Sequence, residues 1–238
     1  MAVLERVEVD EARVRTPDAW YFEVPAIAAL RSSGVDLDPR VTVIVGENGS
    51  GKSTFVEAVA AAWRSGLKSE VGHWGPEPAD EDADLHRALW LRTEWPRPDG
   101  GCFLRAEAMH GLFTEVDAAG TSRRAFDGGL NSRSHGEAFL RYLESRTTER
   151  GLFLLDEPEA ALSFTSCLQL LSLLAAMADT GSQVVLATHS PLLAALPGAT
   201  ILEFGEHGIR PASWAELELV NHWQAFLSRP ESYLRHLF

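Results

Sequence analysis

The chain has 238 residues, a formal net charge of −13 and 45% apolar residues, a size and composition that suit one large α/β domain with a filled core. The negative charge does not support nucleic-acid binding beyond a local basic patch, and no window reaches the roughly 18 apolar residues of a membrane span. Two cysteines cannot build a disulfide framework, and the acidic N-terminus lacks the apolar core of a signal peptide. These features predict a cytoplasmic protein.

The first 45 residues predict short strands and one helical turn. Apolar and charged side chains alternate over residues 3–9, which predicts an edge strand. Residues 20–22 predict a second short strand and residues 25–30 a helical turn. The apolar run 41–45 predicts a buried parallel strand.

Residues 46–54 read GENGSGKST and fit the pattern G-x-x-x-x-G-K-[ST]. Glycines let successive backbone N–H groups turn inward around a phosphate chain, and the helix predicted from residue 54 points its positive end at the anion. Lys52 is expected to reach the β- and γ-phosphates, and the Ser53 hydroxyl to ligate Mg²⁺. The predicted nucleotide-binding residues are Gly46, Glu47, Asn48, Gly49, Ser50, Gly51, Lys52, Ser53 and Thr54.

Regular patterns weaken over residues 65–148, which we interpret as a small inserted subdomain with a helical piece, within a single domain over residues 1–238. Inside this stretch, residues 88–93 and 102–106 predict two strands around a turn. Residues 215–238 predict an amphipathic C-terminal helical tail whose apolar stripe packs on the parent domain, with a partner surface as the alternative.

Two apolar strands end in residues suited to phosphate chemistry. Residues 152–155 lead into Asp156, a predicted Mg²⁺ ligand, and Glu157, which can orient and deprotonate an attacking water. Residues 184–187 lead into His189, which can hydrogen-bond a γ-phosphate and sense its loss. A structural histidine at a strand end is the alternative for His189.

The tetrad Ser134–Glu137, reading SHGE, opens a predicted helix. The Ser134 hydroxyl, the backbone around Gly136 and the helix N-terminus together predict a second anion site, to which we assign Ser134, Gly136 and Glu137. An ordinary capping box between Ser134 and Glu137 fits the same residues, and the two interpretations are compatible.

In this order, the motifs resemble those of the ATP-binding-cassette (ABC) superfamily. Residues 133–137 are similar to its Leu-Ser-Gly-Gly-Gln signature, with Arg133 and His135 as departures, residues 159–163 to its D-loop, and His189 to its switch histidine. More narrowly, the stretches SHGE, LLDEPEAALS and ATHSP and the ending RPESYLRHL resemble those of a group of small soluble bacterial AAA-family ATPases. The resemblance implies a head-to-tail dimer with two ATP molecules, each between one subunit's P-loop and Ser134 and Gly136 of the other.

We therefore expect a P-loop α/β fold with a mainly parallel central sheet, an N-terminal antiparallel β portion and a small inserted subdomain. The expected activity is Mg²⁺-dependent ATP hydrolysis with Lys52, Glu157 and His189 as catalytic residues, in a soluble switch ATPase that dimerises with ATP and serves a DNA-related or defence process. The alternatives are a transporter subunit with a membrane permease partner and a module that binds ATP without hydrolysis. No Q-loop glutamine is evident, and Glu107 is the nearest candidate.

Overall fold

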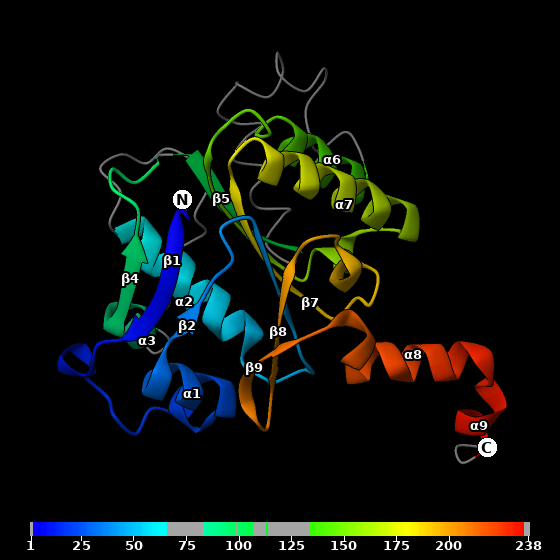
Figure 1. Cartoon of the computed structure of the whole chain (residues 1–238), viewed down its shortest axis with the longest axis horizontal. Coiled ribbons are helices and arrows are strands. Elements are labelled where there is room, and N and C mark those ends of the chain that lie inside the picture. The colour runs from blue at the N-terminus through cyan, green and yellow to red at the C-terminus, as the bar shows by residue number, and fades with distance from the viewer. Residues whose placement is uncertain (1, 66–82, 99, 107–112, 114–133, 236–238) are drawn as a thin grey trace.

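The computed structural model describes residues 2–65, 83–98, 100–106, 113 and 134–235 (Figure 1). Two sheets form its frame. The smaller, antiparallel sheet has the order β2-β1-β4, and the larger has the order β5-β6-β7-β3-β8-β9, in which every neighbouring pair except β8–β9 is parallel. The strands are β1 (Leu4–Val9), β2 (Val35–Asp36), β3 (Val41–Val45), β4 (Leu89–Thr93), β5 (Gly100–Arg105), β6 (Gly151–Asp156), β7 (Gln183–Thr188), β8 (Thr200–Gly205) and β9 (Gly208–Ala212). The predicted mainly parallel sheet and N-terminal antiparallel portion are confirmed.

The inner strands of the large sheet are buried on both faces, which explains their unbroken apolar runs. Along β6, Phe153 and Leu155 enter one core and Leu152 and Leu154 the other, because side chains alternate along a strand. The first core is completed by α6 (His135–Glu144) and α7 (Phe164–Asp179), and the second by α1 (Pro25–Ser33), α2 (Lys52–Ser65), α3 (Ala83–Ala88) and the antiparallel sheet.

One buried glutamine ties the two sheets together. The Gln183 Oε1 accepts the backbone N–H of Leu4 at 2.7 Å, and its Nε2 donates to the carbonyls of Leu4 at 2.8 Å and Asp38 at 2.7 Å. Both the oxygen and the nitrogen of this buried amide therefore have hydrogen-bond partners. Because Leu4 begins β1 and Gln183 begins β7, these bonds hold the antiparallel sheet to the large sheet.

Several local predictions need correction. Residues 20–22 belong to the 3-10 helix Trp20–Glu23, not to a strand. β1 is the central strand of its sheet, not an edge, because the short β2 covers its other side. β4 and β5 do not form one hairpin: β4 pairs with β1, and β5 pairs with β6. Both lie within residues 65–148, so this stretch contributes to the two sheets, and its status as an inserted subdomain stays a prediction.

The C-terminal tail forms α8 (Glu218–Ser228) and α9 (Pro230–Leu234), which extend away from the sheets in Figure 1. Leu217 and Val220 are buried at the start of the tail, but Trp223 is 47% and Leu227 70% exposed. The expected packing of the whole stripe on the parent domain is therefore wrong beyond Val220. Among the described residues, no helix combines the length and the apolar character needed to cross a bilayer.

Candidate active site

The loop that follows β3 is shaped by close backbone approach. A Cβ on Gly46 would lie 2.3 Å from the Phe204 carbonyl oxygen and 2.6 Å from Ser50 Oγ, so only glycine fits there. Gly49 and Gly51 have φ values of +80° and +95°, which L side chains rarely adopt. The loop therefore folds into a turn that presents its backbone at the N-terminus of α2, an arrangement suited to an anion.

Lys52 is the first residue of α2 and is only 3% exposed. Its Nζ donates to the Glu47 carbonyl at 3.0 Å and lies 3.9 Å from Glu157 Oε1. Burial lowers the pKa of Lys52, opposed by Glu157, Asp156 and Glu159. Lys52 is a cation removed from water, and its ion pair with Glu157 is long, so it can pair with a phosphate oxygen.

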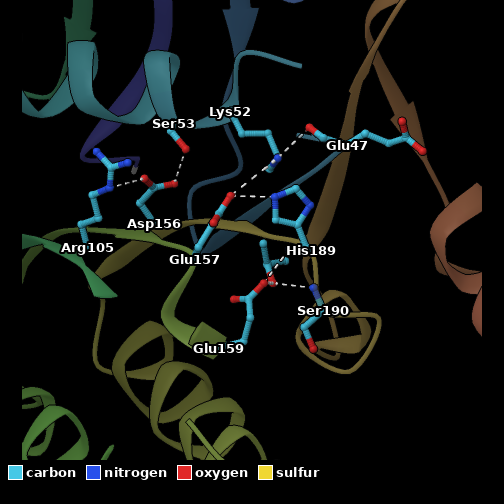
Figure 2. Close-up of polar contacts among 10 residues, drawn as sticks. Glu47, Lys52, Ser53, Arg105, Asp156, Glu157, Glu159, His189 and Ser190 are labelled. Atoms are coloured by element: carbon cyan, nitrogen blue, oxygen red, sulfur yellow. Dashed lines mark hydrogen bonds and ion pairs between the residues drawn. The ribbon is translucent and has the colours of Figure 1, made fainter. Parts of the chain in front are cut away.

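Ser53 and Asp156 meet where α2 begins and β6 ends. Ser53 Oγ donates to Asp156 Oδ1 at 3.1 Å, and the Asp156 side chain is 1% exposed (Figure 2). Burial raises the pKa of Asp156 to about 6, against the opposing effects of Ser53 and Arg105. A hydroxyl and a buried carboxylate are oxygen ligands of the kind that Mg²⁺ prefers, so this pair fits the predicted metal site.

Arg105 supplies a second cation, which the sequence did not single out. Its Nε lies 3.6 Å from Asp156 Oδ2, and its Nη1 pairs with Glu57 of α2. Arg105 stands at the end of β5, directly opposite Asp156 in the β5–β6 register. Only the strand order brings the two together, because 51 residues (156 − 105) separate them in the chain.

Glu157 leaves β6 with φ 48° and ψ 48°, a left-handed conformation that is costly for a non-glycine residue. Its N–H donates to the Ala187 carbonyl at 2.9 Å, which fixes the turn to the end of β7. Glu157 Oε1 lies 2.6 Å from His189 Nε2 (Figure 2). The turn thus holds the carboxylate between His189 and Lys52.

The strand order explains this convergence. β7 lies between β3 and β6, so His189 emerges between the loop after β3 and the carboxylates after β6. In α/β proteins, ligands bind at the carboxyl ends of the parallel strands, which is where these residues lie. The fold and these residues define the class of P-loop nucleoside triphosphatases.

The SHGE tetrad forms the N-terminus of α6 and does contain the capping box. Ser134 Oγ accepts the Glu137 N–H, and Glu137 Oε2 accepts the Ser134 N–H, each at 3.3 Å. A Cβ on Gly136 would lie 3.0 Å from the Ala161 carbonyl oxygen, so glycine is also needed for close packing. The capping role is confirmed, and the anion-binding role of Ser134, Gly136 and Glu137 stays a prediction.

The remaining site predictions are placed as follows. Glu47, Asn48 and Gly49 are exposed at the loop tip, and Thr54 is half-buried in the first turn of α2. Ser50 Oγ is buried and has no hydrogen-bond partner among the described residues, which leaves it available to a ligand. Glu107 and Arg133 lie outside the described residues.

Known families match two stretches of the chain. A model described as "AAA domain" matches residues 27–69, and one described as "AAA domain, putative AbiEii toxin, Type IV TA system" matches residues 138–195. The first contains the loop after β3, and the second contains Asp156, Glu157 and His189. Together the two matches therefore cover the loop after β3 and the residues at the ends of β6 and β7.

Relatives and one solved structure agree with these matches. The chain is 27% identical to the vitamin B12 import ATP-binding protein BtuD of Vibrio atlanticus, over 63% of this chain and 68% of that protein. It is 32% identical to the hemin import ATP-binding protein HmuV of Rhodococcus jostii, over 65% of this chain and 59% of that protein. The SMC head domain from Thermotoga maritima shares its fold, with a TM-score of 0.51 and 16% identity, covering 90% of this chain and 100% of that one.

These matches and the geometry of the site support an ABC-type P-loop ATPase. The match with the Rhodococcus relative spans less than two thirds of that protein.

Proposed function

We propose that this protein is a switch ATPase that hydrolyses ATP to ADP and phosphate and dimerises head to tail when ATP binds. The observation that carries the proposal is the convergence of Lys52 Nζ and His189 Nε2 on Glu157 Oε1, at 3.9 Å and 2.6 Å, beside the loop after β3. A base, a phosphate-binding cation and a hydrogen-bonding imidazole are the groups that this reaction requires.

In this mechanism, Lys52 and the loop amides bind the β- and γ-phosphates. Glu157 accepts a proton from a water molecule as its oxygen attacks the γ-phosphorus, and the bond from that phosphorus to the β–γ bridging oxygen breaks. His189 lies against the same Glu157 oxygen, which supports a role for its ring in orienting the carboxylate; in the proposal it also hydrogen-bonds the γ-phosphate. Ser53 and Asp156 would hold Mg²⁺, which would neutralise phosphate charge.

The position of the SHGE tetrad supports the proposed dimerisation. Ser134 and Glu137 are exposed at the N-terminus of α6, and their side chains cap that helix, so the helix end faces outward. In the head-to-tail dimer this helix end contacts the nucleotide of the second subunit. ATP then favours the dimer because it binds the two-subunit site better than the single-subunit site.

The solution mass of Glu157→Gln, measured by light scattering with and without ATP and Mg²⁺, tests the proposal. We expect the mass to double with ATP, because the variant binds ATP without turning it over. Lys52→Ala in the same background is expected to stay a monomer. A monomer that still binds ATP would overturn the dimer while leaving the ATPase assignment intact.

A matched pair of capping variants separates the trans role of Ser134 from its local role. Ser134 Oγ accepts the Glu137 N–H at the start of α6, and Ser213 Oγ donates to Glu216 Oε2 at the start of the 3-10 helix Trp214–Glu216. Each alanine variant loses one exposed side-chain hydrogen bond at a helix start, about 1 kcal/mol or less. We expect only Ser134→Ala to weaken ATP-dependent dimerisation, and equal behaviour of the two variants would reduce Ser134 to a helix cap.

Two cellular roles are supported by different observations. The toxin–antitoxin description of the model matching residues 138–195 supports a defence role, which we place first. The import proteins among the relatives support the alternative, a transporter subunit with a membrane permease. Retention of the tagged chain with a membrane protein after detergent extraction would favour transport, and recovery without one would favour the switch ATPase. The cytoplasmic location stays a prediction.

A further inference from the structure

His189 is held from both ends by one short segment of chain. Its ring Nε2 lies 2.6 Å from Glu157 Oε1, and its backbone N–H donates to Glu159 Oε1, also at 2.6 Å (Figure 2). The two glutamates flank Pro158, whose ring fixes φ, at the start of the 3-10 helix Pro158–Ala161. The spacing between the two carboxylates is therefore constrained by the backbone.

Glu159 also holds the residue before the histidine. Its Oε1 accepts the hydroxyl of Thr188 at 2.6 Å, and Thr188 Oγ1 in turn accepts the N–H of Ser190 at 3.0 Å. Three consecutive residues at the end of β7 are thus tied directly or indirectly to one carboxylate oxygen. Hydrogen bonds to an ionised acceptor are shorter and stronger than neutral ones, which suits a carboxylate in this place.

The other oxygen of Glu159 is not used in this network. Glu159 Oε2 is buried and has no hydrogen-bond partner among the described residues. A buried, unpartnered carboxylate oxygen is costly, so the hydrogen bonds that Oε1 accepts must offset that cost. The cost is understandable if the place of His189 depends on Glu159.

The segment that carries Glu159 is itself packed against α6. A Cβ on Gly136 would lie 3.0 Å from the Ala161 carbonyl oxygen and 3.3 Å from Leu162 Cδ2. The N-terminus of α6 therefore lies directly against the 3-10 helix that positions Glu159.

We propose that Glu159 is a positioning residue that sets the His189 ring against Glu157 by holding the backbone of Thr188 and His189. This inference rests on the proposed ATPase mechanism, in which Glu157 and His189 act at the γ-phosphate. Glu159 itself touches neither the loop after β3 nor the attacking water in this mechanism. Its removal lowers turnover through His189 and leaves ATP binding in place.

The test is a double-mutant cycle on ATP turnover with Glu159→Ala, His189→Ala and the double variant. We expect Glu159→Ala to lower kcat by about tenfold to a hundredfold, the range of a lost charge-assisted hydrogen bond, with less than a threefold change in KM. In the His189→Ala background the same change is expected to have no further effect on kcat, because both act as one unit. Additive losses would overturn the proposal.

Two further variants separate positioning from folding. Glu159→Gln keeps an oxygen that can accept from Thr188 and His189, so it is expected to recover most of the turnover lost in Glu159→Ala. Glu206→Ala removes an exposed glutamate and is expected to turn over as the unmodified chain does. Equal losses in Glu159→Gln and Glu159→Ala, or a matching loss of ATP binding, would overturn the positioning role.

A readout that does not need turnover completes the design. The ring nitrogen signals of His189, assigned by their loss in His189→Ala, are expected to shift in Glu159→Ala and return in Glu159→Gln. Unmoved signals would overturn the proposal. Failure of the ATPase mechanism would appear separately, as an unmodified chain without turnover or a Glu157→Gln variant with full turnover.

Discussion

Glu157 Oε1 and His189 Nε2 lie 2.6 Å apart, although 32 residues separate them in the chain. The contact exists because β6 and β7 are neighbours and both end at the same edge of the sheet. The left-handed turn at Glu157 directs its side chain across that edge, within 3.9 Å of Lys52. One carboxylate oxygen is therefore shared by the residues that the mechanism assigns to proton transfer and phosphate binding.

Replacement of this carboxylate by an amide tests its role as a base. Glu157→Gln keeps the size and one oxygen of the side chain but cannot take up a proton from water. We expect kcat to fall by about a hundredfold or more, in the range that general base catalysis contributes, while ATP binding persists. Phosphate release and binding of a fluorescent ATP analogue measure the two effects, and unmodified turnover would contradict the assignment.

Lys52 is expected to contribute mainly to ATP binding, so its replacement should lower ATP affinity, which the Glu157→Gln variant retains. Lys52→Ala removes a buried cation that lies beside the phosphate loop, and we expect ATP affinity to fall by about tenfold or more. Arg40→Ala is the matched control, because Arg40 forms an exposed ion pair with Asp179 at 2.6 Å. Comparable losses of ATP affinity in both variants would indicate a general charge effect rather than a phosphate contact.

The positions of the phosphate loop, the Asp156–Glu157 pair and His189 at the ends of buried strands could be predicted from the sequence, for a common reason. Each follows an apolar run that forms a buried parallel strand, and local patterns of this kind determine where the strand ends. The capping box of Ser134 and Glu137 is local in the same way.

Arg105 and the split between β4 and β5 could not be predicted, because both depend on which strands become neighbours. Arg105 contacts Asp156 only because β5 pairs with β6, and no local pattern encodes that choice. The two strands look like a hairpin in the sequence, but β4 pairs with β1 and β5 pairs with β6. The exposed stripe of α8 was missed because amphipathicity indicates an apolar face without naming what covers it.

The glycine at the start of the phosphate loop should be more sensitive than those at its tip. In Gly46→Ala the new Cβ meets backbone at 2.3 Å, and we expect a loss of about 2 kcal/mol or more of unfolding free energy, together with weakened ATP binding. Gly49→Ala meets no atom within 4 Å and has only the cost of its φ of +80°, about 1 kcal/mol.

Gly198→Ala provides the control for this comparison. Gly198 has a φ of +75° and open space around it, so its variant has the same backbone cost as Gly49→Ala without touching the loop. Urea denaturation followed by circular dichroism gives the three free energies. Equal losses in Gly46→Ala and Gly198→Ala would show that the loop adapts to the clash.

The buried carboxylate of Asp156 should make the stability of the metal-free protein depend on pH. Burial raises its pKa from the ordinary value of 3.8 to about 6 in the folded state. Between these values the unfolded chain is ionised at Asp156 and the folded chain is protonated, so unfolding releases a proton. The stabilising contribution is therefore present below pH 3.8 and is lost as the pH rises to about 6.

Asp156→Asn isolates this contribution, because the amide has nearly the same shape and does not titrate. A shift of about two pKa units corresponds to roughly 3 kcal/mol, so the variant should gain about that much relative to the unmodified chain between pH 4 and pH 7. Urea denaturation without Mg²⁺ measures the difference at each pH. A difference that stays constant across this range would mean that Asp156 is ionised throughout, with Arg105 at 3.6 Å fully compensating its burial.

The same substitution should abolish the stabilisation by Mg²⁺ and ATP, since a neutral amide is a weaker ligand for a divalent cation than a carboxylate.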